Sequence, residues 1–184
     1  IFFPNYCWGT KVQNKKQTNE CKIVQVGGMC FETEDQHDVG SFKVVKKLVE
    51  SGCYFDLFMH PTDSHKKGTP EYERRYSDYI SLAEATGRVK IWPSISASEI
   101  VYKLSEYDFG LNMINAANFS DTPWKVHNPQ GLAYILSARN FDYIDAGLNI
   151  LIDGNHNFNL RFFKDSGKID DFPVGESSSE ISTG

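Results

Sequence analysis

The sequence predicts a doubly wound parallel sheet of the α/β class. Between residues 22 and 152, short runs rich in β-branched and aromatic residues alternate with segments whose apolar residues repeat at helical spacing. Glycines follow several of these segments and mark where an element ends. Such alternation is typical of parallel strands joined by right-handed crossovers, with helices on both faces of the sheet.

The first part of this region contains three predicted strands and two predicted helices. The strands are expected at residues 22–27, 54–59 and 88–92. Apolar residues at helical spacing from Phe42 to Val49 indicate the first helix, which Gly52 ends. Pro70 opens a longer helix that ends just before Gly87. One face of that helix carries its larger apolar residues and an alanine: Tyr72, Tyr76, Tyr79, Ile80 and Ala83.

The second part continues the alternation with two more strands. Ser96 and Glu99 have the spacing of a capping box, which predicts a helix from about 96 to 107. A fourth strand is expected at 109–114, and a polar loop at about 115–128. A further helix is expected at about 129–146, interrupted near Ala138 and capped by Gly147, followed by a fifth strand at 150–152.

Length and charge bound the organisation and exclude some functions. The chain has 184 residues, enough for one domain with flanking segments. We expect an incoming segment or linker at 1–20, the domain at 21–164, and an acidic, disordered polar tail at 165–184. Because the first residue is Ile1, the chain is expected to be a fragment of a longer protein. The formal net charge of -5 argues against a nucleic-acid binder that relies on bulk positive charge.

Other global features predict the setting of the protein. No run approaches the roughly 20 consecutive apolar residues of a membrane span, so no integral membrane segment is expected. The four cysteines form no C-x-x-C pair and suggest no zinc site. Free thiols in a reducing compartment are the favoured interpretation, which predicts a cytoplasmic protein.

In a doubly wound sheet, ligands bind beyond the carboxyl ends of the strands, where the strand order reverses. This rule directs attention to the loop after Gly27 and Gly28 and to the loop at 115–128. The two glycines either make a tight turn or let the backbone approach a phosphate, and the turn is favoured. Neither the G-x-G-x-x-G dinucleotide fingerprint nor the G-x-x-x-x-G-K-[ST] phosphate loop is present.

Two clusters of polar residues have both an ordinary and a functional interpretation. The acidic and histidine-containing run at 32–38 is favoured as a solvated loop over a metal or proton-transfer site. His60, His65, Lys66 and Lys67 form a basic cluster after the second strand. That cluster either meets a phosphate or serves surface solubility.

The segment at 138–152 is the most informative part of the chain. Arg139 and Asp142 are three residues apart, so on a helix they share a face. A cation there is suited to a diphosphate, and a nearby carboxylate accepts hydrogen bonds from ribose hydroxyls. An ordinary surface ion pair fits the same spacing, which by itself does not decide between the two interpretations.

This segment resembles the "N-K-x-F-[DE]-Y-x-A-x-G-x-P-[VI]-[IV]" signature in the C-terminal half of GT-B glycosyltransferases. The run Tyr107-Asp108-Phe109-Gly110-Leu111 likewise resembles the "x-Y-D-x-G-L" strand entry of that family. The resemblance extends over about residues 22–153 and includes the order of the elements. It implies a Rossmann-like domain that forms one half of the GT-B two-domain architecture.

The resemblance also implies a function and its residues. Gly27, Gly28, Arg139, Asn140 and Asp142 would bind a nucleotide-sugar donor, with the carboxylate of Asp142 on the ribose hydroxyls. The nucleotide-sugar is a substrate, so no cofactor and no metal are expected, and no catalytic residue is assigned. The acceptor wall would belong to an N-terminal domain outside this chain, which alone would turn over nothing. Many relatives work at a membrane surface, so the resemblance allows a cytoplasmic protein that is peripheral at the membrane.

The chain departs from the family pattern at several positions, which keeps alternatives open. Tyr134 stands where many retaining members have a second acid, and Asp145 and Asn149 replace an alanine and a proline. No clear Arg and Lys pair clamps the diphosphate; the candidates are Lys66, Lys67 and Lys125. A degenerate, non-catalytic GT-B-like domain and a GT-B-fold sugar-nucleotide epimerase or phosphorylase are the alternatives. A receiver domain is disfavoured because the first and third strands end without the acidic residues it needs.

Overall fold

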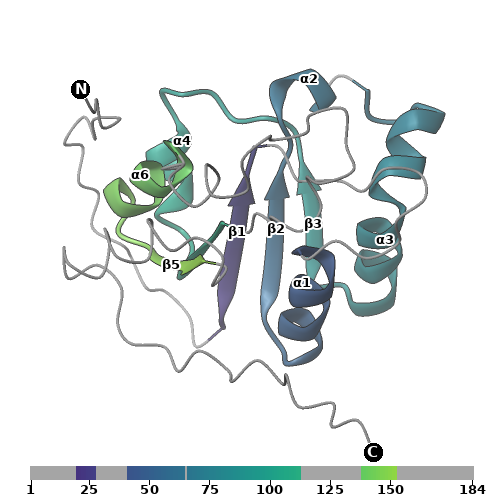
Figure 1. The fold of residues 1–184 in the computed structure, drawn as a ribbon, viewed down its shortest axis with the longest axis horizontal. Coiled ribbons are helices and arrows are strands. Elements are labelled where there is room, and N and C mark those ends of the chain that lie inside the picture. The colour runs from purple at the N-terminus through teal and green to yellow at the C-terminus, as the bar shows by residue number, and fades with distance from the viewer. Residues whose placement is uncertain (1–19, 28–40, 65, 113–137, 153–184) are drawn as a thin grey trace, which may run out of the picture.

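The computed structural model describes residues 20–27, 41–64, 66–112 and 138–152. These residues form a five-stranded, all-parallel sheet with helices (Figure 1). The predicted α/β class and parallel sheet are therefore confirmed. The expected incoming segment up to residue 19, the loop at 115–128 and the tail at 165–184 lie outside the described residues.

The strands follow the predicted positions closely. Their bounds are β1 Lys22–Val26, β2 Tyr54–Phe58, β3 Val89–Trp92, β4 Phe109–Asn112 and β5 Asn149–Ile152. The order across the sheet is β3-β2-β1-β4-β5. After β3 the chain crosses back over β1 to form β4, so the order reverses between these two central strands. We call this place the switch point.

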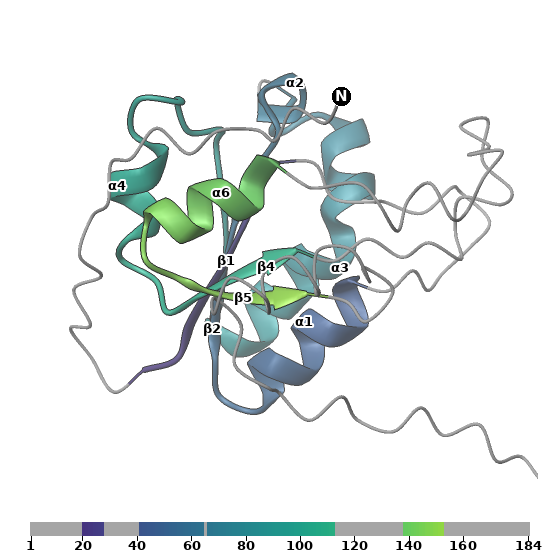
Figure 2. The ribbon, with the colours of Figure 1, turned by 60° about the vertical axis from the view of Figure 1, so that its left-hand side comes forward.

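Four of the helices in the described ranges lie in two layers on opposite faces of the sheet, α1 and α3 on one face and α4 and α6 on the other (Figure 2). The bounds of the helices in these ranges are α1 Ser41–Glu50, α2 Pro61–Ser64, α3 Pro70–Thr86, α4 Ile100–Leu104 and α6 Ala138–Asp145. One hydrophobic core joins α1 and α3 to β1, β2, β3 and β4, and includes Val45, Tyr76 and Leu57. A second core on the other face joins α4 and α6 to the sheet, and includes Leu104 and Tyr143.

The longest helix, α3, has the start and end that its sequence predicts. The side chain of Thr69 accepts a hydrogen bond from the amide of Tyr72, and Pro70 occupies the first turn. At the other end Gly87 adopts the left-handed conformation with φ 66°, and its N–H donates to the carbonyl of Ala83. The predicted apolar face is correct, because Tyr72, Tyr76 and Tyr79 are buried against the sheet.

The capping box predicted at Ser96 and Glu99 is wrong. The hydroxyl of Ser96 donates directly to the carboxylate of Glu99, so the two side chains satisfy each other instead of the backbone. Glu99 is the residue before the helix and makes no side-chain capping bond. The helix α4 is consequently shorter than expected, at five residues. The four-residue helix α2 was not expected, because a single turn carries no periodic signal.

Candidate functional site

The two central strands separate at the switch point. Strand β1 pairs with β2 along five residues, whereas it pairs with β4 only at Ile23↔Phe109 and Val24↔Gly110. Both strands continue for two more residues beyond that last pair. In an open parallel sheet, this separation beyond the carboxyl ends is where a ligand is expected.

The hydroxyl of Tyr143 fills the place of the missing strand pairing. It accepts a hydrogen bond from the amide of Val26 on β1 (3.2 Å) and donates one to the carbonyl of Leu111 on β4 (3.1 Å). The side chain is fully buried. Burial is the main cause that raises the pKa of Tyr143, to about 12, so the hydroxyl keeps the proton that it donates. A side chain from α6 thus holds β1 and β4 at a fixed separation.

Gly110 makes room for this tyrosine. A methyl group at residue 110 would lie 2.6 Å from Cδ1 of Tyr143, and closer still to Cγ and Cδ2 of the ring. Its φ is not in the positive range, in contrast to Gly27, Gly52 and Gly87. Glycine is therefore required at residue 110 by lack of space and not by backbone conformation.

Helix α6 places Arg139 beside the end of β1. Asn140 and Tyr143 of the helix and Ala146 just after it are fully buried and spaced three residues apart, and Asp145 is buried as well. The adjoining Arg139 brings its Nη2 atom to 3.4 Å from where a Cβ on Gly27 would stand. Gly27 has φ 85°, and its amide donates to the carbonyl of Phe58 on β2 (2.9 Å). Two residues predicted for the same site are therefore neighbours.

Asp142 is a half-buried carboxylate on the same helix. The part of the chain that the structure describes gives its carboxylate no hydrogen bond and no positively charged partner. Burial raises the pKa of Asp142, and the negative charge of Asp145 raises it further. None of the described residues therefore occupies the hydrogen-bonding capacity of this carboxylate.

Asn140, in contrast, is engaged within the protein. Its side chain is fully buried, and its Oδ1 accepts a hydrogen bond from Nδ2 of Asn112 at the end of β4 (2.7 Å). The bond joins α6 to the sheet next to the Tyr143 contact. The role of Asn140 as a donor-binding residue stays a prediction, and its observed contact is with Asn112.

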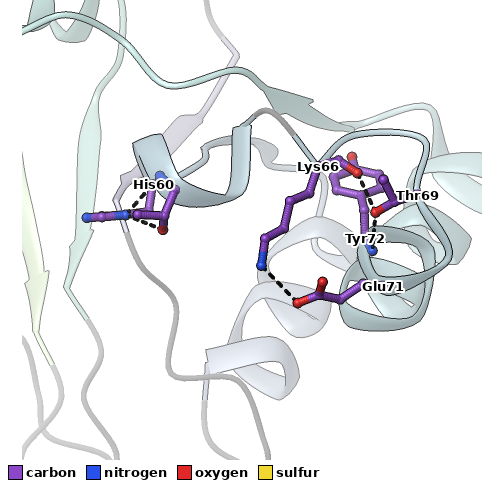
Figure 3. Close-up of polar contacts among 6 residues, drawn as sticks. His60, Lys66, Thr69, Glu71 and Tyr72 are labelled. Atoms are coloured by element: carbon purple, nitrogen blue, oxygen red, sulfur yellow. Dashed lines mark hydrogen bonds and ion pairs between the residues drawn. The ribbon is translucent and has the colours of Figure 1, made fainter.

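The loop after β2 engages one of the candidate cations in a local ion pair (Figure 3). Nζ of Lys66 lies 2.9 Å from Oε1 of Glu71, and this pair lowers the pKa of the Glu71 carboxyl. The backbone carbonyl of Lys66 also accepts from the hydroxyl of Thr69, the cap of α3. Lys66 is thus part of the start of α3, while Lys67 beside it is exposed.

His60, at the carboxyl end of β2, has a defined hydrogen-bonding state (Figure 3). Its Nδ1 accepts from the backbone amide of Thr62 (3.3 Å) and lies 2.8 Å from the hydroxyl of the same residue. An acceptor Nδ1 requires the proton of a neutral ring to be on Nε2. The imidazole is exposed at the edge of the sheet where the switch point lies.

The motif before β4 has a structural role. The hydroxyl of Tyr107 donates to Oδ2 of Asp56 on β2 (2.7 Å), and the indole N–H of Trp92 donates to the same oxygen (2.9 Å). Burial and the bond to Asp56 raise the pKa of Tyr107. Oδ2 of Asp108 accepts from the amide of Lys22 (3.0 Å), which ties the start of β1 to β4. These contacts connect the segment before β4 with β1 and β2, and β3 with β2.

The remaining predicted positions lie outside the described residues: Gly28, His65, Lys125 and Tyr134, together with the acidic run at 32–38. The sequence did not single out Tyr143, Gly110 or Asn112 for the site. The spacing of Asn140, Tyr143 and Ala146 is a signal that could have identified the buried face of α6. No periodic spacing in the sequence indicates that Tyr143 packs against Gly110.

The described residues contain no group of three or more His, Cys, Asp or Glu side chains arranged to hold a metal ion. None of the helices in the described ranges is long and apolar enough to cross a bilayer.

The fold and the site define an α/β protein with an all-parallel sheet and a switch point between β1 and β4. No family model matches the sequence, and no curated protein or solved structure is similar enough to match it.

Proposed function

We propose that this domain binds a nucleotide-sugar at the switch point and forms the donor-binding half of a glycosyltransferase. The observation that carries the proposal is the half-buried Asp142 carboxylate, on the helix whose Arg139 lies beside Gly27. A carboxylate with available lone pairs suits the two vicinal hydroxyls of a ribose. The resemblance of residues 138–152 to the GT-B signature supports the same assignment.

The chemistry of the neighbouring groups is complementary to a diphosphate. A guanidinium presents several donors in a plane and pairs well with phosphate oxygens. Gly27 has no side chain, so a phosphate can approach the backbone next to Arg139. In this arrangement Arg139 offsets part of the negative charge of the diphosphate, and Asp142 sets the position of the ribose.

The proposed reaction is transfer of the sugar to an acceptor. The bond between the anomeric carbon and the diphosphate oxygen breaks, and a bond from the acceptor oxygen to that carbon forms. The nucleoside diphosphate leaves with the electron pair, and Arg139 stabilises its growing negative charge. The acceptor binds to a second domain, which also supplies the group that takes its proton. This chain alone therefore binds the donor without turning it over.

A binding domain without catalysis is the second candidate. Two observations favour it: Lys66 is paired with Glu71, and Asn140 is bonded to Asn112. Neither group is then available to a donor without exchange of partners. A GT-B-fold epimerase would use the same nucleotide-sugar and the same Asp142 contact.

Calorimetric titration of the full chain with UDP, GDP and ADP tests the proposal. We expect one of them to bind, and Asp142→Asn to weaken its binding by roughly tenfold or more, the effect of losing hydrogen bonds to a charged group. Asp78→Asn, an exposed carboxylate on α3 across the sheet, is the matched control and should bind as the wild type does. Absence of binding to all three, or equal affinity of Asp142→Asn, would contradict the proposal.

A further inference from the structure

We propose that the switch point recognises the sugar of its ligand by accepting hydrogen bonds from sugar hydroxyls through the side-chain carbonyls of Gln25 and Asn112. The inference rests on the proposed function and goes further, because it assigns two residues, outside the motifs, to a sugar subsite. It also separates the recognition of hydroxyls from the recognition of the diphosphate.

Both side chains are buried polar groups with an unsatisfied acceptor. Gln25 is 1% exposed and Asn112 is fully buried. Within the described residues, Oε1 of Gln25 and Oδ1 of Asn112 have no hydrogen-bond partner. A buried carbonyl without a donor destabilises the folded state, and native proteins contain few of them. Two such groups on adjacent strands therefore require a specific explanation.

Their position supplies that explanation. Gln25 lies on β1 just past the last residue paired with β4, and Asn112 is the final residue of β4. Gln25 is opposite Leu57 in the register with β2, on the face of the sheet covered by α1 and α3. Asn112 lies on the other face, where it contacts α6. The two carbonyls therefore flank the separation of β1 and β4 from opposite faces of the sheet.

The chemistry of these groups determines what they can bind. An amide carbonyl accepts hydrogen bonds and cannot donate them, so its partner must carry a donor. The oxygens of an ionised diphosphate carry no hydrogen, whereas each hydroxyl of a sugar can donate. An ammonium group is disfavoured, because Arg139 is a cation beside the end of β1. A polyhydroxylated group is therefore the ligand that completes both acceptors.

The test compares each nucleoside diphosphate with its sugar conjugate: UDP with UDP-glucose, GDP with GDP-mannose, and ADP with ADP-glucose. Titrations use the full chain as wild type, Gln25→Met and Leu57→Met. In the wild type we expect the sugar of the matching donor to raise affinity about tenfold or more, the size of one or two completed buried hydrogen bonds. Gln25→Met should lose most of that gain and bind the nucleoside diphosphate as before.

A stability measurement separates recognition from a structural role. Gln25→Met replaces the unsatisfied carbonyl with an apolar group of similar size, so its urea midpoint should be unchanged or higher without ligand. Leu57→Met, at the paired position on β2, is the matched control and should keep the full increase in affinity that the sugar provides. A loss of the affinity gained from the sugar, together with an unchanged or higher midpoint, supports the inference.

The remaining outcomes are distinguishable. If a nucleoside diphosphate binds but the sugar adds nothing, or if Gln25→Met keeps the gain, the inference is overturned and the proposed function stands. If no nucleotide binds, both are overturned. If Gln25→Met does not fold, the wild type is titrated with the 2-, 3-, 4- and 6-deoxy sugar analogues of the donor. Loss of the gain with at least one analogue supports the inference, and equal binding of all four overturns it.

Discussion

Replacing Gly110 by alanine tests the central packing contact of the sheet. The added methyl would lie 2.6 Å from Cδ1 of Tyr143 and closer to two other ring atoms, so the buried ring must move. Overpacking of a core costs about 1–3 kcal/mol. Moving the ring also takes its hydroxyl from the amide of Val26 and the carbonyl of Leu111, which costs about 1–3 kcal/mol more.

We therefore expect Gly110→Ala to lower the free energy of unfolding by about 2–6 kcal/mol, a large share of the roughly 5–15 kcal/mol of a typical domain. Urea denaturation measures the change. The same substitution in a Tyr143→Leu background should cost less than about 1 kcal/mol, because the two residues are in direct contact. Gly52→Ala is the control: its methyl would meet no atom within 4 Å, so only its positive φ opposes it. Equal costs of Gly110→Ala in both backgrounds would refute the reasoning.

Two further predictions concern α6. Tyr143→Phe removes the hydroxyl and keeps the ring, so it should lower the free energy of unfolding by about 1–3 kcal/mol. It should also speed hydrogen exchange at the amide of Val26, which NMR measures. Unchanged protection of that amide would show that the hydrogen bond to Tyr143 contributes nothing. Because the pKa of Asp142 is raised, the folded state binds the carboxyl proton of Asp142 more tightly than the unfolded state does. The protonated carboxyl therefore contributes its full stabilisation below the ordinary carboxyl range, near about pH 4. That stabilisation is lost as the pH rises through the raised pKa. The stability of the wild type minus that of Asp142→Asn should therefore fall with rising pH in urea titrations, and a difference that rises instead would show that the carboxylate has a stabilising partner.

The sequence predicted the elements well where local signals are strong. Strands β1, β2 and β3 are rich in β-branched or aromatic residues. Thr69 starts α3 through its side-chain oxygen, and Pro70 and Gly87 mark its ends through their backbone preferences. Ser96 and Glu99 show the limit of such local signals. Their spacing fits a capping box, but the two side chains bond to each other, and spacing alone does not distinguish these outcomes.

The candidate site was predicted only in part. Arg139 and Gly27 were both named from the sequence, and the fold brings them together. The contacts that shape the switch point join residues far apart in the chain, such as Gly110 with Tyr143. Local periodicity carries no information about such pairs. The unsatisfied carbonyls of Gln25 and Asn112 are likewise visible only once every neighbour is placed.

The resemblance to the GT-B signature rests partly on residues with structural roles. Tyr107 bonds to Asp56, Asp108 ties β1 to β4, and Gly110 accommodates Tyr143. Packing and hydrogen bonding within the fold are therefore enough to explain the Y-D-x-G-L residues before and in β4 and the aromatic residue after Asp142, and no ligand is needed to explain them. Within the signature, Arg139 and Asp142 are the residues on which the proposed function depends.

A crystal structure of the full chain with a bound nucleoside diphosphate tests the proposed donor site most directly. We expect a ribose with its hydroxyls within hydrogen-bonding distance of the Asp142 carboxylate, at the separation of β1 and β4. A nucleotide bound elsewhere on the sheet, or a ribose with no contact to Asp142, would contradict it.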